Sequence, residues 1–229
     1  MFEGFPREMI EFMLQIRLNN NKEYMSAHRE EYERVMKQPY YGLIEALTPI
    51  ALRIDPGMEV RPNKVLSRIF RDTRFSNDKS PYRDHHWLAF RHAGESKDMA
   101  VMLWFEVRME YISWGLGYWG ENRPAMDIFR RRLISHPGDW TGLLKTLEGT
   151  GLSVEGEKYK RLVPPVSVAP PLDSHYPMKS LYISRNSAPY DVIFTPKLAE
   201  MIITDYETLA PFYRLLRGYY ELSLLEGVS

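Results

Sequence analysis

The sequence predicts an α+β fold, in which N-terminal helices precede a central, largely antiparallel sheet and C-terminal helices pack on that sheet. Apolar residues follow helical spacing through residues 1–55, alternate with a period of two through much of 65–118, and return to helical spacing after residue 124. Hydrophobic residues make up 44% of the 229 residues, which is enough for a large core. Neither a linker nor a repeat divides the chain, so we expect a single domain over residues 1–229.

Three helices are expected in the first 55 residues. Phe5 and Phe12 share one face of the first helix. The asparagines at positions 19–21 interrupt the pattern and provide an N-cap for the second helix. A third helix follows Pro39, and Pro49 is expected to kink or restart it because proline lacks the amide hydrogen of a helical hydrogen bond.

The middle of the chain predicts a meander of four short strands. We expect these strands at residues 65–70, 85–91, 99–107 and 111–118. In the second strand, Leu88 faces one side of the sheet, whereas Trp87 and Ala89 face the other. Most of the connections are short, which favours antiparallel pairing of consecutive strands.

The C-terminal part returns to helices. We expect helices near residues 124–135 and 140–147, a last strand at 190–194, and a final helix that begins at Pro196. Residues 151–178 are rich in proline, so we expect this segment to hold little regular structure and to pack across the sheet.

Composition narrows the class of protein. The formal net charge is zero, which gives no overall attraction to nucleic acid or to an anionic membrane. The chain has no cysteine, so disulfides, thiolate metal sites and a cysteine nucleophile are excluded. We expect neither a signal peptide nor a membrane span, and we therefore expect a cytoplasmic protein with no membrane partner.

Residues 115–120, GLGYWG, match the glycine pattern of dinucleotide-binding loops. That pattern binds a pyrophosphate only where it opens the first crossover of a parallel βαβ unit. Here the preceding strand is the return arm of a hairpin and no strand is expected after the helix, so we do not expect a dinucleotide site. A glycine-rich turn before a helix still exposes amide groups that bind anions. The alternative is a turn whose aromatic side chains cover the sheet.

The six histidines do not form a metal site by their spacing. His85 and His86 are neighbours on a strand and point to opposite faces, and the segment around His28 lacks the second histidine of a metalloprotease helix. We therefore expect neither a metal ion nor a cofactor. His86 would line a pocket if the basic loop described next folds over it. Nucleophile-elbow and Walker motifs are absent from the sequence, and no pair of carboxylates is singled out by its spacing.

The strongest signal is an uneven distribution of charge. Between Arg61 and His92 the chain carries eight lysines and arginines against three aspartates, a local charge of +5. Such a segment on a neutral protein favours a discrete anion site over a broad nucleic-acid surface.

Part of this segment, residues 71–83, forms a loop between two expected strands, with Phe75 and Tyr82 as aromatic anchors. Arg71 and Arg74 can each donate forked hydrogen bonds to a carboxylate. Two interpretations stay open. The surplus cations bind a phosphate or carboxylate ligand, or ion pairs close the loop on itself. The acids for such pairs are Asp72, Asp78 and Asp84.

Three stretches of the sequence carry a family resemblance: RIFRDTRFSNDKSPYRDHHWLAF, NNNKEYMSAHREEYE and WGLGYWGENRPAMDIFRRRL. They resemble the family known as domain of unknown function 2461, a set of conserved hypothetical proteins of bacteria and fungi. The resemblance is strongest up to about residue 136. Arg83 stands where the family usually has lysine, and Tyr24 where it commonly has tryptophan. The resemblance implies an α+β domain of this size and supplies no established activity. The positions that match the family are Arg68, Arg71, Asp72, Arg74, Phe75, Asp78, Lys79, Pro81, Tyr82, Gly115 and Gly117.

We therefore expect a pocket at one end of the sheet that binds an anionic small molecule. The candidate ligand-binding residues are Arg68, Arg71, Arg74, Lys79, Tyr82, Trp114, Gly117 and Trp119. Positive groups would assist a phosphoryl or acyl hydrolytic step, but the sequence identifies no catalytic residue. Two alternatives remain: a non-enzymatic module that binds nucleic acid or protein through the same basic face, and a purely structural salt-bridge network. Nucleic acid is the less favoured partner, and the sequence does not define an oligomeric state.

Overall fold

The structure is a computed structural model, which describes residues 2–74, 76–118 and 120–227. Its helices are α1 (Glu8–Leu18), α2 (Lys22–Ala27), α3 (Arg29–Tyr32), the π-helical turn η1 (Glu33–Lys37), α4 (Gln38–Ile54), α5 (Pro62–Val65), α6 (Arg123–Ser135), α7 (Pro137–Lys145), α8 (Leu172–His175), the 3₁₀ turn η2 (Tyr190–Phe194) and α9 (Lys197–Leu225). The strands are β1 (His86–Arg91), β2 (Val101–Val107), β3 (Ile112–Tyr118), β4 (Ser153–Glu155) and β5 (Tyr182–Arg185).

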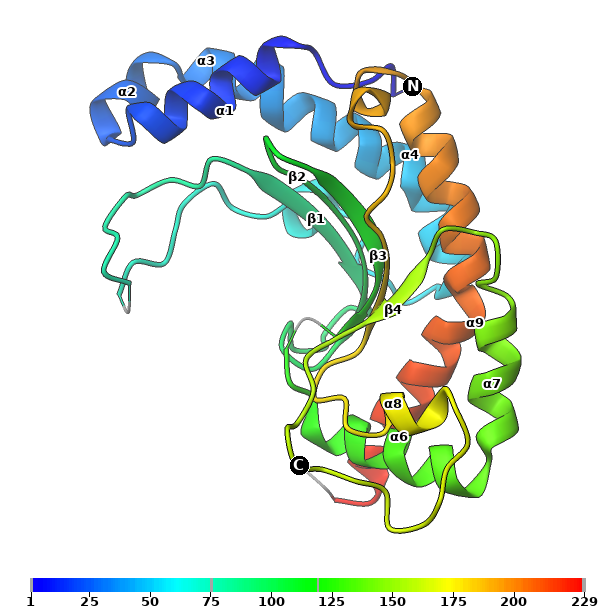
Figure 1. Cartoon of the computed structure of the whole chain (residues 1–229). Coiled ribbons are helices and arrows are strands. Elements are labelled where there is room, and N and C mark those ends of the chain that lie inside the picture. Colours follow the sequence, from blue (N-terminus) through cyan, green and yellow to red (C-terminus); the bar gives the residue numbers. More distant parts are fainter. Residues whose placement is uncertain (1, 75, 119, 228–229) are drawn as a thin grey trace.

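The strands form one antiparallel sheet in the order β1-β2-β3-β5-β4. The first three strands correspond to the last three strands of the expected four-strand meander, so the predicted α+β class and antiparallel pairing are confirmed. Helix α9 packs on β2 and β3, α4 packs on β1, and the two helices contact each other. Figure 1 shows these two long helices on one side of the sheet, with α1–α3 at one end of the molecule and α6–α8 at the other.

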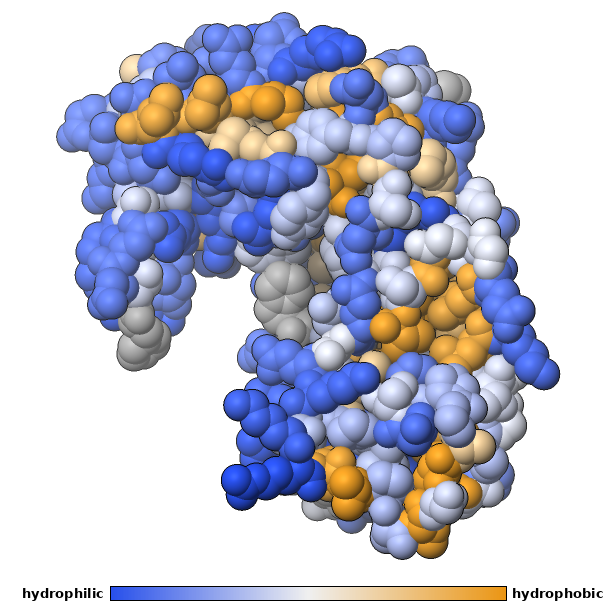
Figure 2. Space-filling model, viewed as in Figure 1, coloured by the Kyte–Doolittle hydropathy of each residue, from blue (hydrophilic) through white to orange (hydrophobic). Residues whose placement is uncertain are grey.

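The alternation of side chains gives the sheet two unlike faces. Leu88, Phe105 and Leu116 are fully buried on the face that α4 and α9 cover. Trp87 and Trp104 point to the opposite face, as the alternation in the sequence predicts. The second face, called the open face below, lies toward the hollow that Figure 2 shows between an extended arm and the lower part of the molecule.

Several expected elements differ in the structure. Residues 65–70 were expected as a strand, but α5 ends at Val65 and only the isolated bridges Leu66–Leu88 and Phe70–Tyr82 follow. Pro62 starts α5 because its fixed φ suits the first helical turn. The expected strand at 190–194 is the 3₁₀ turn η2, and α4 continues through Pro49 as one helix.

The expectation of little regular structure in residues 151–178 was partly wrong, because this segment contains β4 and α8. Strands β4 and β5 have three and four residues, which is too short for a pattern of alternation to identify them. They follow α6 and α7, where the only strand predicted from the sequence was at 190–194. Both pair in antiparallel fashion, so no βαβ crossover is formed and the glycine pattern at 115–120 has no dinucleotide-binding context.

A buried carboxylate joins α9 to the sheet. Asp205, which is 4% exposed, accepts hydrogen bonds from the Trp114 indole at 2.7 Å and from two nitrogens of Arg185 at 2.6 and 2.8 Å. These contacts fix the positions of β3 and β5 on the helix. Replacing either Asp205 or Arg185 with a neutral residue would leave the other charge buried without its partner and would destabilise the fold.

His86 is also buried on the covered face. Its two ring nitrogens lie 3.1 Å from the Tyr32 hydroxyl and 2.9 Å from the Ser67 hydroxyl, and the ring has no accessible surface. Burial, with smaller contributions from His85 and Arg83, lowers the pKa of His86 to about 3. The ring is therefore neutral in the folded protein and belongs to the core, not to a pocket beneath the basic loop.

This pKa makes stability depend on pH. Between about pH 3 and 6.5 the unfolded chain binds a proton at His86 that the folded protein does not bind. Protonation therefore favours the unfolded chain in this range: the free energy of unfolding has its full value above pH 6.5 and falls as pH is lowered. We expect His86 to reduce the free energy of unfolding by about 1.4 kcal/mol per pH unit between pH 6 and 4. Urea unfolding should show a smaller slope for His86→Gln, whereas His136→Gln on the surface should keep the wild-type slope. Equal slopes in all three proteins would contradict the assignment.

Gly115 lies at a close approach of β5 to β3. A Cβ atom at this position would be 2.0 Å from the carbonyl oxygen of Ile183 on β5. Only glycine allows this approach, which lets β5 pair with the edge of β3 that β2 leaves free. Gly115 and Gly117 therefore lie inside a strand, not in the anion-binding turn that the sequence suggested.

Replacing Gly115 with alanine should displace β5. We expect Gly115→Ala to lower the free energy of unfolding by about 3 kcal/mol, because the clash is with backbone that cannot rotate away. Gly142→Ala in α7 is the matched control: a Cβ atom there meets nothing within 4 Å, and alanine should stabilise the helix by about 0.5–1 kcal/mol. Chemical denaturation measures both changes, and a neutral Gly115→Ala would contradict the close approach.

Candidate functional site

The basic loop forms an arm that extends from the sheet beside β1, drawn in teal in Figure 1. At its base, Phe70 bridges to Tyr82, and the backbone of Tyr82 exchanges two hydrogen bonds of 2.9 Å with the Asn20 side chain. Arg17 of α1 binds Asp84 at 2.6 Å. The arm is thereby fixed to the N-terminal helices, and its outer part reaches into solvent beside the hollow, where Figure 2 shows a hydrophilic surface.

Part of the charge in the arm pairs internally. Arg71 binds Asp78, and Arg74 binds Asp72 at 2.6 Å, where its guanidinium lowers the pKa of Asp72 to about 2. The Lys79 ammonium donates to the carbonyl oxygen of Thr73 at 2.9 Å. The third aspartate, Asp84, binds Arg17 of α1 and not a cation of the arm. Internal pairing therefore offsets two of the basic side chains and leaves others without a carboxylate.

A groove of about 790 Å³ runs between the arm and the edge of the open face at β1. We call it the cationic groove. Its floor includes Trp87, Ala89 and Met102. Of the described residues that line it, seven are basic and one, Asp72, is acidic; the basic ones are Lys64, Arg68, Arg71, Arg74, Arg83, Arg91 and Lys97. Among the described residues, no carboxylate lies within 4 Å of Arg68 or Arg83.

Two of these cations are crowded over one indole. The Arg83 guanidinium carbon lies 4.7 Å from the Trp87 ring centre and the Lys97 ammonium lies 5.0 Å from it. Burial first, and then the neighbouring Arg83 and Arg91, lower the pKa of Lys97. Burial and the charge of Arg71 also lower the pKa of Arg83. A negative ligand in this groove would relieve both effects, because it would replace lost hydration and offset like-charge repulsion.

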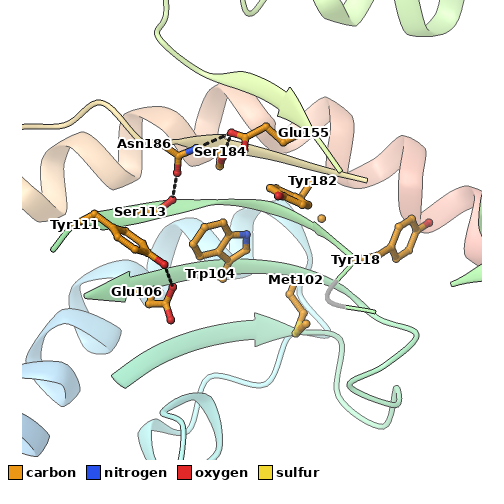
Figure 3. Close-up of a pocket in the computed structure, with 11 residues that line it drawn as sticks. Met102, Trp104, Glu106, Tyr111, Ser113, Tyr118, Glu155, Tyr182, Ser184 and Asn186 are labelled. Carbon is orange, nitrogen blue, oxygen red and sulfur yellow. Dashed lines mark hydrogen bonds between the residues drawn. The ribbon is translucent and has the colours of Figure 1, made fainter. Parts of the chain in front are cut away.

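A second depression adjoins the groove on the open face. This aromatic cleft has a volume of about 490 Å³ and shares Met102 with the groove. Figure 3 shows Trp104, Tyr111 and Tyr182 pointing into it, between Glu106 on one side and Glu155 on the other. Its lining residues are Met102, Trp104, Glu106, Tyr111, Ser113, Gly117, Tyr118, Glu155, Tyr182, Ser184 and Asn186.

Hydrogen bonds order the polar side of the cleft. One carboxylate oxygen of Glu155, Oε1, accepts from Ser184 at 2.6 Å, from Asn186 at 2.6 Å and from Ser153 at 3.0 Å. The amide oxygen of Asn186 in turn accepts from the Ser113 hydroxyl. Glu106, across the cleft, is bound by Arg108 at 2.8 Å. The side chains of β3, β4 and β5 thus form one network whose geometry is set by the sheet register (Figure 3).

The structure brings some of the sequence-predicted site residues together and separates others. Arg68, Arg71 and Arg74 all line the cationic groove, while Gly117 lines the aromatic cleft. Three further candidates, Lys79, Tyr82 and Trp114, line neither of the two depressions.

Each of these three has another environment. The Lys79 ammonium caps a carbonyl within the arm, and Tyr82 is 5% exposed in the core. Trp114 is on the covered face and hydrogen bonds to Asp205. The last candidate, Trp119, and the arm's proposed anchor Phe75 lie outside the described residues.

Sequence reasoning did not select several lining residues. The alternation along β1 and β2 places Trp87 and Trp104 on the face opposite the core, so this signal was present but was not used to propose a site. Lys97 lies in a turn without any pattern. Glu155 and Tyr182 reach the cleft through two very short strands that pair over a long sequence separation, which no local pattern reveals.

The part of the chain that the structure describes holds neither a metal-ligand cluster nor a membrane-spanning helix. No group of three or more His, Asp or Glu side chains there is arranged to hold a metal ion. None of the helices in the same residues combines the length and apolar character that crossing a bilayer requires.

A family model matches residues 8–215 of the chain; its description is a conserved hypothetical protein, DUF2461. The match covers most of the 229 residues, so the chain belongs to the DUF2461 family and the resemblance stated from the sequence is confirmed. The match extends well beyond residue 136, through the strands that complete the cleft and most of α9. A comparison with curated proteins found no match.

Proposed function

We propose that the protein binds a small molecule through a phosphate or carboxylate group that occupies the cationic groove. The observation that carries this proposal is the composition of the groove, in which seven basic side chains face one acid. Asp72 is bound by Arg74 and also acts electrostatically on Arg83, so this one carboxylate is shared between cations and does not neutralise the groove.

The electrostatics of the groove support an anion at its floor. The pKa values of Lys97 and Arg83 are lowered because partial burial and neighbouring cations destabilise their charged forms in the folded protein. An anion bound between Lys97 and Arg83 would stabilise both charged forms. Guanidinium groups also match the forked geometry of phosphate and carboxylate oxygens.

A purely structural network explains less of the groove. In such a network carboxylates or carbonyl oxygens would satisfy each cation. Arg83 does donate to the carbonyl oxygens of Arg68 and Phe70 at 2.7 Å, and Arg91 donates to that of Glu95. Among the described residues, however, no carboxylate within 4 Å neutralises the charge of Arg68 or Arg83. A nucleic-acid surface would need a broader basic area than one groove on a chain of zero net charge.

Isothermal titration with pyrophosphate at low salt tests the proposal. We expect wild-type protein to bind pyrophosphate and the double variant Arg68→Gln/Lys97→Gln to bind at least tenfold more weakly, a loss of about 1.4 kcal/mol or more. The affinity should also fall as sodium chloride is raised, because the groove is open to solvent and its charges are screened.

Lys145→Gln, an exposed substitution on α7 that removes one unit of charge, is the control and should keep the wild-type affinity. The proposal is wrong if pyrophosphate does not bind, or if the groove variant and the control bind it equally well.

A further inference from the structure

The aromatic cleft differs from the cationic groove in the hydrogen-bonding atoms that it offers a ligand. Glu155 Oε1 takes three hydrogen bonds, whereas its second oxygen, Oε2, has no hydrogen-bond partner among the described residues. The carboxylate is therefore held in position with one acceptor left over. Because this oxygen is negative, it favours a donor group and disfavours a second anion.

Two donors on the aromatic walls are also left over. Among the described residues, neither the indole nitrogen of Trp104 nor the hydroxyl of Tyr182 makes a hydrogen bond. The hydroxyls of Ser113 and Ser184 and the amide of Asn186 are by contrast occupied within the network. The cleft thus offers at least one acceptor and two donors next to apolar ring faces.

This combination selects a class of ligand group. A ring hydroxyl both donates and accepts, so neighbouring hydroxyls on one ring can bind Glu155 Oε2 and also accept from Trp104 or Tyr182. An ammonium group only donates, and it would leave the two donors of the cleft without an acceptor. The C–H faces of a sugar ring can pack on the aromatic side chains, and a volume of about 490 Å³ is within the range of small-ligand sites.

The position of the cleft relates this ring to the anion. Met102 borders both depressions, so a single ligand can occupy them together on the open face. Basic side chains border the β1 end of that face, whereas Glu155 lies at its β4 end. A ligand with an anionic group at one end and hydroxyls at the other matches this distribution.

We infer that the aromatic cleft binds a hydroxyl-bearing ring of the same ligand whose anionic group occupies the cationic groove, so that the ligand belongs to the sugar phosphates or nucleotides. This inference rests on the proposed function. The ring is recognised by Glu155 and Trp104, and the phosphate by the groove.

Titration of four probes separates the two parts of the ligand. The probes are inorganic phosphate, ribose 5-phosphate, glucose 6-phosphate and AMP. We expect at least one of the three organic phosphates to bind tenfold or more tightly than inorganic phosphate. AMP binding more tightly than both sugar phosphates would indicate a nucleotide ligand, and the reverse order would indicate a sugar phosphate.

Variants of the cleft then locate the added affinity. Glu155→Gln and Trp104→Phe should each remove most of the advantage of the organic phosphate and leave the affinity for inorganic phosphate within twofold of wild type. Glu148→Gln, an exposed substitution of the same kind beyond α7, should change neither value. Circular dichroism of each variant verifies that the fold is retained.

The outcomes distinguish this inference from the proposed function. If inorganic phosphate binds in the groove but none of the organic phosphates binds more tightly, the inference is overturned and the anion site stands. If no phosphate binds, the proposed function fails, and the inference fails with it. Tighter binding of the diamine putrescine than of any sugar phosphate would overturn the assignment of the cleft to hydroxyls.

Discussion

The carboxylate of Asp205 is a buried contact that joins the helical layer to two strands of the sheet at once. Its hydrogen bonds to Trp114 and Arg185 fix β3 and β5 on α9 at the face that is closed to solvent. Because both strands are held from that side, their other side chains are presented to the open face in a defined register. The close approach at Gly115 has the complementary effect, since it lets β5 lie against β3 and carry its polar side chains to the cleft.

The same arrangement explains why the two depressions lie together. The open face carries no helix in Figure 1, so its polar and aromatic side chains are not used for packing a second layer. The arm closes one side of this face with cations, and the short strands β4 and β5 close the other with Glu155 and its hydrogen-bonding partners. Pairs such as Arg71–Asp78 hold the arm in shape, whereas among the described residues no carboxylate lies within 4 Å of Arg68 or Arg83.

Much of the fold was predictable because its signals are local. The α+β class, three of the four strands of the expected meander and the long C-terminal helix all follow from apolar spacing. The +5 segment drew attention to Arg68, Arg71 and Arg74, and all three line the cationic groove. What the sequence did not reveal depends on long-range pairing. Glu155 and Tyr182 reach the cleft only through β4 and β5. Trp114, a candidate ligand-binding residue from the sequence, faces the core because of the strand register.

The indole N–H signals in a ¹H–¹⁵N NMR spectrum test the central claim most directly, because the five tryptophans sample different parts of the molecule. Trp87 lies under the groove and Trp104 in the cleft, whereas Trp114 and Trp140 are hydrogen bonded in the core. Inorganic phosphate should shift the Trp87 signal alone among these four. A hydroxylated phosphate ligand should shift Trp87 and Trp104 and leave Trp114 and Trp140 in place. An unchanged Trp87 signal at saturating phosphate, or equal shifts of all four, would contradict the account.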